Sequence, residues 1–212
     1  MQTNFFDRRR FLAGSVALSA STLLPLSQVF AETVDGLFDN ITLEDDVMGD
    51  INAKVTIIEY ASMTCPHCKS FHEQVVPVLK KKYIDTGKAK YILRPFPFDG
   101  DRRGEAAFML AKCAPNKNYY AMIDALFHSQ ESWGRQSNPV AELLQISKQA
   151  GITEEGFKSC LSNQELLTKI IDGRNRAAKD FGVRATPTVF VNDEKLGDSR
   201  LETVTNAIEA AL

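Results

Sequence analysis

Two cysteines separated by two residues stand where a predicted strand gives way to a predicted helix. Residues 55–60 read Val-Thr-Ile-Ile-Glu-Tyr, and four of the six are β-branched and one is aromatic, which is typical of a buried strand. From residue 69 to residue 82 the apolar side chains recur with the period of a helix. Cys65 and Cys68 therefore open a helix that follows a strand, an arrangement that indicates a dithiol redox site.

The first 31 residues have the features of an export leader. Residues 8–10 are three arginines, residues 11–26 are apolar, and residues 29–31 suit a signal peptidase, so we expect cleavage before Glu32. Residues 7–12 also match the bacterial twin-arginine motif, in which two arginines and any one residue precede Phe-Leu. A general secretory leader is the alternative. By either route the protein is expected in the periplasm.

Composition limits the classes of partner. The 212 residues are 44% apolar and 25% charged, as in a soluble globular protein with a sizeable core. The formal charge is −2 and no basic stripe dominates, so a nucleic-acid partner is not expected. Removal of the leader leaves 22 basic and 26 acidic residues, and all four cysteines. In an oxidising compartment those cysteines can form disulfides.

The remaining pattern gives an order of elements. Residues 89–98 contain a second strand, and strand, helix, strand in this order predicts a right-handed parallel crossover. Helical stripes then fill residues 101–172. Strand character returns at residues 188–191, residues 194–196 can pair back on them, and Ser199 is placed to cap a last amphipathic helix.

Two local features refine this order. Pro77 lies inside the first predicted helix, where it removes a backbone hydrogen bond and should kink the helix. Residues 43–48 are expected to add a short strand at the edge of the sheet.

Three motifs resemble those of the DsbA-like thiol:disulfide oxidoreductases of the thioredoxin superfamily. They are Cys65-Pro66-His67-Cys68, Leu-Arg-Pro-Phe-Pro at residues 93–97, and Gly-Val-Arg-Ala-Thr-Pro-Thr at residues 182–188. The resemblance covers the whole mature chain. It implies an α/β thioredoxin fold with a helical subdomain inserted after the βαβ half.

The resemblance also implies a division of the chain. A cleaved, twin-arginine-like export signal would occupy residues 1–31. The thioredoxin-like domain would comprise residues 32–100 and 173–212, and the helical insertion would comprise residues 101–172.

The chemistry expected at the motif follows from its place on the helix. Cys65 would be the nucleophile, because the unpaired N–H groups and the dipole at a helix N-terminus favour an anion. Pro66 suits the first helical position, and His67 adds a donor or a positive charge. Together they should lower the thiol pKa, stabilise the reduced form and make the disulfide a strong oxidant. Cys68 would be the buried resolving thiol; an inert structural disulfide is the alternative.

The resemblance assigns roles to three further residues. Glu59, on the strand before the motif, would be a buried acid that exchanges a proton with Cys68, although an ordinary strand acid facing solvent fits the pattern equally. Thr186 and Pro187 would pack against the active-site disulfide. Their peptide bond would be cis, and Thr186 would offer its backbone to the substrate.

A second cysteine pair lies on the apolar stripes of two predicted helices of the insertion. Cys113 and Cys160 are either two small buried residues or a second disulfide, and export favours the disulfide. The bond requires the two Cα atoms to lie within about 7 Å.

We expect no metal and no other cofactor. Cys65, Cys68, His67 and His72 are possible ligands, but a zinc site needs a second close pair. Covalent haem attachment needs a histidine directly after the second cysteine, and Lys69 stands there.

The remaining histidines and several large aromatic residues are placed less directly by the sequence. His72 and His128 are predicted at the surface or at a helix edge. Trp133 and residues 96–98 could line an apolar surface for unfolded substrates or could pack in the core.

The sequence thus predicts an exported enzyme that introduces disulfide bonds into reduced, unfolded exported proteins. The resemblance adds a DsbB-like membrane partner that reoxidises it, and a monomeric state is expected. A disulfide isomerase or reductase is the alternative within enzymes. A chaperone-like binding protein on the same scaffold is the alternative outside them.

Overall fold

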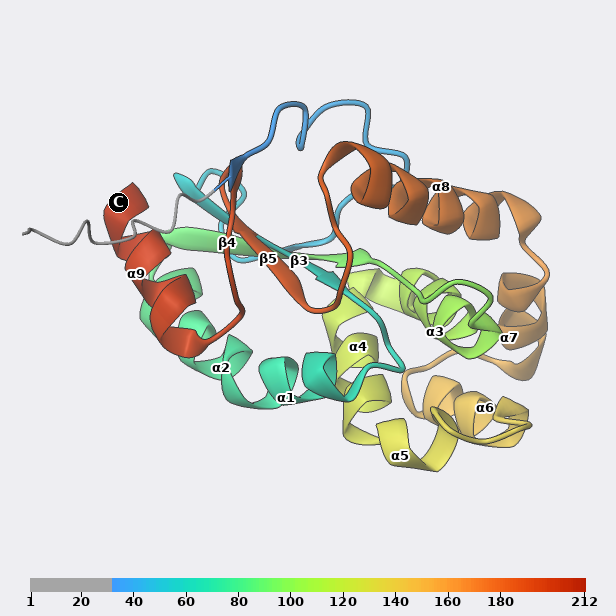
Figure 1. Ribbon diagram of the computed structural model, residues 1–212. Helices are drawn as coiled ribbons and strands as arrows, with labels where there is room; N and C mark the ends of the chain where they lie inside the picture. Colours follow the sequence, from blue (N-terminus) through green and yellow to red (C-terminus); the bar gives the residue numbers. More distant parts are fainter. Residues whose placement is uncertain (1–31) are drawn as a thin grey trace, which may run out of the picture.

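The sheet of the computed structural model, which describes residues 32–212, has six strands (Figure 1). The predicted leader, residues 1–31, lies outside the described residues. The strand order is β1-β6-β5-β3-β4-β2. Only β3 and β4 are parallel, and each other pair of neighbours is antiparallel. The strands are β1 (Glu32–Thr33), β2 (Val47–Met48), β3 (Val55–Ala61), β4 (Ala89–Pro95), β5 (Thr188–Val191) and β6 (Glu194–Lys195).

The central strand β3 is buried along its whole length. It pairs in parallel with β4, from Val55 opposite Ala89 to Ala61 opposite Pro95, and in antiparallel register with β5. The predicted strand–helix–strand crossover and the two closing strands are therefore confirmed. The edge strand β2 covers only the last two residues of the segment 43–48 in which it was expected.

Side chains of β3 alternate between two layers of core. Val55, Ile57 and Ala61 face a cluster that includes Val204 and Ile208 of α9 (Leu201–Ala211). The alternate side chains, such as those of Ile58 and Tyr60, face a second cluster that includes Phe181. Because side chains alternate along a strand, Glu59 belongs to the first face. Figure 1 shows α1, α2 and α9 together on one side of the sheet and α8 on the other.

The first helical unit is broken as Pro77 predicts. Instead of one helix, the chain forms α1 (Pro66–Gln74), α2 (Val76–Leu79) and a π-helical turn, η1 (Lys80–Ile84). Proline lacks the N–H that a continuous helix would use, so the ladder is interrupted just before it. The break leaves α1 as a short helix that has Cys65 at its N-cap and Cys68 in its first turn.

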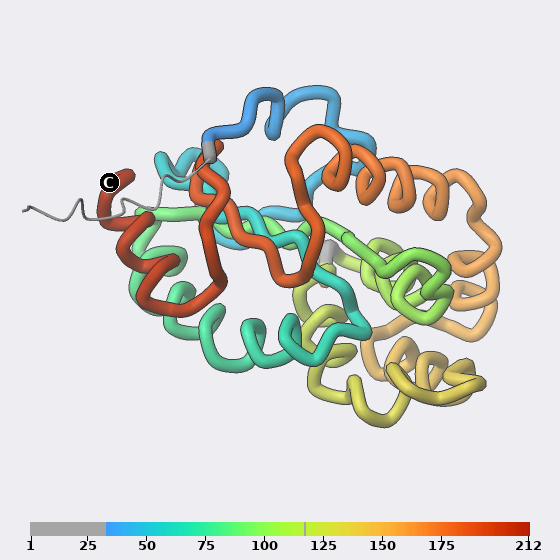
Figure 2. The backbone as a smooth tube through the Cα atoms, in the orientation of Figure 1, coloured from blue at the N-terminus to red at the C-terminus, as the bar shows by residue number. Residues whose placement is uncertain are grey.

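The insertion is a group of helices at one end of the sheet, and the chain passes through it between β4 and α8 (Figure 2). Its helices are α3 (Arg102–Lys112), η2 (Pro115–Lys117), α4 (Tyr119–His128), α5 (Gln130–Trp133), α6 (Val140–Gln149) and α7 (Glu154–Leu161). The helix α8 (Gln164–Asp180) then leads back to the sheet. The boundary between the insertion and the thioredoxin-like domain, expected after residue 172, falls inside α8, which continues through it without a break. This boundary stays a prediction.

One surface prediction and one capping prediction are wrong. His72 is buried rather than exposed, because the face of α1 that carries it packs on α4: its ring lies 4.9 Å from that of Phe127, and its Nε2 is hydrogen-bonded to Asp124. Ser199 does not cap α9, whose N-cap is Arg200. Instead the Asp198 carboxylate accepts a 2.9 Å hydrogen bond from the Arg200 N–H.

The remaining aromatic assignments divide between core and surface. Trp133 is fully buried and its Nε1–H donates to the Leu126 carbonyl at 2.9 Å, so it is a core residue. Phe96 is buried whereas Phe98 is 44% exposed, and His128 is exposed as predicted. Along residues 32–212, no helix combines the length and the apolar character needed to cross a bilayer.

Candidate active site

Cys65 lies at the junction that the sequence indicated. It is the N-cap residue of α1, with extended backbone angles (φ −81°, ψ 120°), and Pro66 takes the first helical position. The Cys65 carbonyl accepts the first hydrogen bond of the helix, from the Lys69 N–H at 3.2 Å. The thiol of Cys65 is therefore held beside the unpaired amide groups of the first turn.

The pKa of the Cys65 thiol is lowered from 9.0 to about 5. The largest cause is a hydrogen bond with the Cys68 thiol, which stabilises the thiolate. Thr186 and the N–H groups of Cys68 and His67 act in the same direction, and burial opposes them. The direction agrees with the expectation, but His67 contributes through its backbone while its side chain is exposed.

Cys68 is chemically the opposite of Cys65. It is completely buried, and burial, the hydrogen bond with Cys65 and the nearby Glu59 carboxylate all raise its pKa. In the structure both residues are thiols rather than a disulfide. At neutral pH one sulfur is therefore a thiolate and the other a thiol, which suits a nucleophile and a resolving residue.

Glu59 is fully buried, so the alternative of a solvent-facing strand acid is wrong. Burial raises its pKa from 4.5 to about 8; a hydrogen bond from the Tyr91 hydroxyl lowers it, and the negative charge on Cys65 raises it further. Tyr91 donates to Oε2, whereas Oε1 has no partner among the described residues. An acid with a pKa near neutrality can both give and take a proton at physiological pH.

The Thr186–Pro187 loop faces Cys65. The peptide bond between the two residues is cis. Sγ of Cys65 lies 3.4 Å from the Thr186 carbonyl oxygen, to which it donates a hydrogen bond when the thiol is protonated. The loop leads directly into β5, where Thr188 lies opposite Tyr60 of β3, so the central sheet fixes the distance between the loop and the cysteine motif.

Three polar residues at the site were not predicted from the sequence. Tyr91 reaches Glu59 from the neighbouring strand. Asp101 accepts a hydrogen bond from the hydroxyl of Thr64, the residue before Cys65. Gln130 donates to the carbonyl oxygens of Met63 and Cys65. A tyrosine in an apolar strand was the one available signal, since the other two contacts depend on how the insertion packs.

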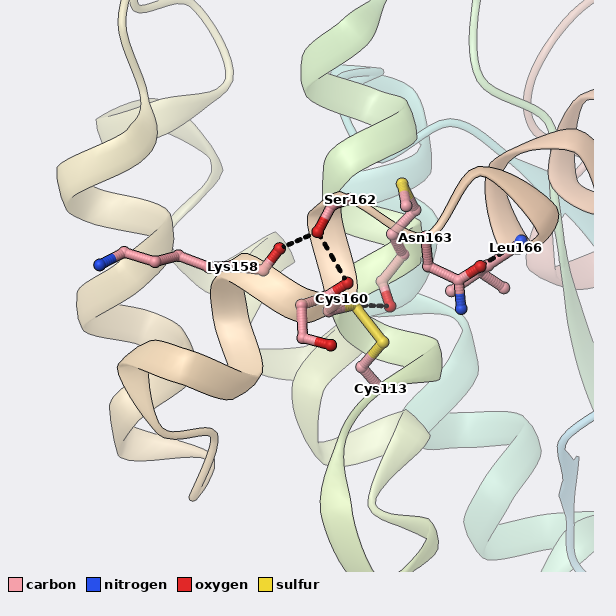
Figure 3. The surroundings of a disulfide bond; sticks show 8 residues. Cys113, Lys158, Cys160, Ser162, Asn163 and Leu166 are labelled. Carbon is pink, nitrogen blue, oxygen red and sulfur yellow. Dashed lines mark hydrogen bonds between the residues drawn. A yellow bond between two sulfur atoms is a disulfide. The ribbon is translucent and has the colours of Figure 1, made fainter.

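The second cysteine pair forms a disulfide, with Cα atoms 6.2 Å apart (Figure 3). Cys113 closes α3 and Cys160 lies near the end of α7, so the bond joins two helices of the insertion. Directly after it, Asn163 caps α8: its side chain accepts a 3.0 Å hydrogen bond from the Leu166 N–H. This disulfide thus fixes the insertion at the point where the chain turns back to the sheet.

No group of three or more histidine, cysteine, aspartate or glutamate side chains in residues 32–212 is arranged to hold a metal ion.

Comparisons with known proteins agree with this geometry. The family model described as thioredoxin matches residues 42–210. The chain is 35% identical over 169 residues to RC0029 of Rickettsia conorii, which is named as a protein-disulfide oxidoreductase; the match covers 79% of this chain but only 60% of that protein. It is 29% identical over 169 residues to a disulfide bond formation protein D of Bacillus anthracis, covering 78% of this chain and 77% of the relative.

Among solved structures, that of alpha-DsbA1 from Wolbachia pipientis is similar. The TM-score is 0.72 at 34% sequence identity, and the match covers 79% of this chain and 90% of that one.

Proposed function

Since the chain belongs to the DsbA-like group of the thioredoxin superfamily, we propose that it is an exported thiol:disulfide oxidoreductase that introduces disulfide bonds into other proteins. The observation that carries the proposal is the contrast between its two active-site thiols. Cys65 has a pKa of about 5, whereas burial raises that of Cys68.

The reaction starts from the oxidised enzyme, in which Cys65 and Cys68 form a disulfide. A substrate thiolate attacks Cys65 Sγ, so the bond between the two enzyme sulfurs breaks and a mixed disulfide forms. A second substrate thiolate then attacks the substrate sulfur of this mixed disulfide and releases Cys65 as a thiolate. The substrate has lost two electrons and gained a disulfide, and the enzyme has been reduced to the dithiol.

Glu59 has a role in the first step. Cys68 leaves as a thiolate in a buried place that disfavours a negative charge, so it needs a proton. Glu59, with a pKa of about 8, is largely protonated at neutral pH and lies near enough to influence the charge on Cys68. We assign to it the donation of that proton.

The direction of electron flow follows from the stabilised Cys65 thiolate. A thiolate is the product of disulfide reduction, so stabilising it favours the reduced enzyme and makes the oxidised enzyme a stronger oxidant. The Thr186 backbone, which the Cys65 thiol already contacts, is placed to pair with an extended substrate segment. Reduced, unfolded exported proteins are the proposed substrates, and a DsbB-like membrane protein is the proposed reoxidant of the monomer.

Measurement of the reduction potential tests the proposal. The equilibrium with glutathione should give a value far above the roughly −270 mV of thioredoxin and near the roughly −120 mV of a strongly oxidising member of the group. A potential close to that of thioredoxin would instead assign the protein to reduction or isomerisation.

A second assay separates the enzyme from a binding protein. The oxidised protein should form disulfides in a reduced, denatured test protein, and Cys65→Ala should abolish this. If Cys65→Ala retained the full effect on recovery of the test protein, a chaperone-like role would replace the proposed one.

A further inference from the structure

One buried amide of the insertion reaches the backbone of the nucleophile. Gln130, on the short helix α5, is only 6% exposed. Its Nε2 donates to the Met63 carbonyl at 2.9 Å and to the Cys65 carbonyl at 3.0 Å. A glutamine amide nitrogen carries two hydrogens, so both of its donors are used on the active-site loop.

The local structure of α5 fixes the direction of this side chain. Trp133 is one turn further along the helix and fully buried, with its Nε1–H bonded to the Leu126 carbonyl, so it anchors the same face of α5 in the insertion. Gly134 ends the helix; a Cβ there would lie 2.7 Å from the Gln130 carbonyl oxygen and 3.3 Å from its Cγ. The glycine leaves the space that Gln130 occupies.

The insertion holds the same loop from a second helix. Asp101 is the N-cap of α3, yet its carboxylate does not cap the helix and instead accepts the hydrogen bond of the Thr64 hydroxyl. A Cβ at Gly104 would lie 2.9 Å from that carboxylate, so this glycine also leaves room for the contact. Three consecutive residues, 63–65, are thus bound by side chains of the insertion.

We propose that Gln130 is a positioning residue for the nucleophile, which fixes the backbone at Met63 and Cys65 so that the Cys65 sulfur stays beside the first-turn amides of α1. The inference rests on the proposed function, and extends it by giving the helical insertion a part in the redox chemistry. This role differs from packing, because Gln130 makes directional hydrogen bonds to two backbone carbonyls, those of the residues before and after Thr64.

The physical link runs through the backbone angles at Cys65. The first-turn N–H groups of His67 and Cys68 stabilise the thiolate only while the side chain projects toward them. The Cys65 carbonyl is bound by Gln130 and by the Lys69 N–H. Without Gln130, the peptide groups around Cys65 can rotate and the sulfur spends less time in that position.

The test compares two substitutions of glutamine by methionine, which keeps the size of the side chain and removes the amide. Gln130→Met is the variant, and Gln149→Met, at an exposed position at the end of α6, is the control. The rate of alkylation of Cys65 by iodoacetamide is measured against pH in the reduced proteins. We expect the midpoint for Gln130→Met to rise by about one pH unit, about a tenfold loss of thiolate below the midpoint. The control should match the wild type.

The same variant should change the equilibrium with glutathione. A tenfold shift in the equilibrium constant corresponds to about 30 mV, toward a less oxidising enzyme. A folded Gln130→Met protein with the alkylation curve of the wild type would overturn the inference, as would an equal shift in Gln149→Met.

A second variant, Gln130→Asn, tests the inference if Gln130→Met does not fold. Gln130→Asn keeps a donor but cannot span both carbonyls, so a smaller rise of the midpoint is expected, and an unchanged curve would again reject the inference. Alkylation by iodoacetamide does not depend on what the enzyme oxidises. The wild-type reduction potential can therefore contradict the proposed function while the Gln130 result stands, and the reverse is also true.

Discussion

At the scale of single residues, the buried carboxyl group of Glu59 is balanced between its charged and neutral forms. Glu59 has no ion-pair partner among the described residues, and its one hydrogen bond comes from the Tyr91 hydroxyl. That bond favours the charged carboxylate, whereas burial favours the neutral acid. The balance gives a pKa of about 8, a value that suits the proton donation to Cys68 that we propose.

Tyr91→Phe keeps the ring and removes the one hydrogen-bond donor that Glu59 has within residues 32–212. The pKa of Glu59 should therefore rise above its value in the wild type, because burial is then less opposed. Nuclear magnetic resonance of the labelled glutamate carboxyl in the oxidised protein measures this shift without the charge of the Cys65 thiolate. Tyr83→Phe is the control, since Tyr83 donates in the same way to Glu209, in a different pair. An unchanged or lower pKa of Glu59 in Tyr91→Phe would contradict this account.

The lowered pKa of Cys65 predicts that the free energy of unfolding depends on pH differently in the reduced and oxidised forms. Its pKa is about 5 in the folded reduced protein and about 9 in the unfolded chain, so between these values the unfolded state binds the extra proton. The free energy of unfolding of the reduced form should then rise with pH, by up to about 1.4 kcal/mol per pH unit. The oxidised form has no Cys65 thiol and lacks this contribution.

Denaturant unfolding of both forms between pH 5 and pH 8 checks this prediction. The Glu59 carboxyl titrates in each form, so its effect is mostly removed when the oxidised curve is subtracted from the reduced one. The difference should grow with pH and disappear below about pH 5. Two curves that stay parallel over this range would show that the Cys65 thiolate is not stabilised by the fold.

At the scale of helices and strands, the apolar pattern predicted most elements and missed features that depend on neighbours. Pro77 correctly marked the break between α1 and α2 because proline acts on its own helix. Ser199 failed as a cap because Asp198, one residue earlier, captures the Arg200 N–H. His72 was misplaced because α4, which buries it, lies about fifty residues further along the chain.

The disulfide of the insertion should stabilise its helices. Cys113 and Cys160 are 47 positions apart, and a bond that closes a loop of this size restricts the unfolded chain considerably. Replacing both by alanine should lower the free energy of unfolding by about 2–4 kcal/mol, measured in denaturant with the active site reduced. Ser159→Ala, at an exposed position on the same helix, should have little effect. A double variant as stable as the wild type would show that packing alone holds α3 on α7.

At the scale of the whole molecule, the insertion both extends the core and holds the active-site loop. The fold could be predicted because three short motifs and their order are sequence features. The contacts of Gln130 and Tyr91 could not be predicted in the same way. Gln130 lies 65 positions from Cys65, and Tyr91 lies 32 positions from Glu59. Their roles arise only when the insertion and the strands have packed, and a single sequence does not report that packing.

The position of β1 in the sheet favours one site for cleavage of the leader. Glu32 and Thr33 form β1, which pairs with β6 at the edge of the sheet. Cleavage before Glu32 leaves this strand intact, whereas cleavage a few residues later would remove it. We therefore predict that the exported protein begins at Glu32, which the intact mass of the purified mature protein measures directly; a mass showing a start beyond Thr33 would contradict it.

The leader itself should act through the twin-arginine route, and its arginines allow a direct test. Replacing Arg8 and Arg9 by lysine keeps the positive charge that a general secretory leader needs but removes the arginine pair before Arg10-Phe11-Leu12. The double variant should accumulate in the cytoplasm as the uncleaved precursor, while Arg10→Lys, at the variable position of the motif, should be exported normally. Fractionation followed by mass measurement distinguishes the two forms. Normal cleavage of the double variant would assign the leader to the general secretory route.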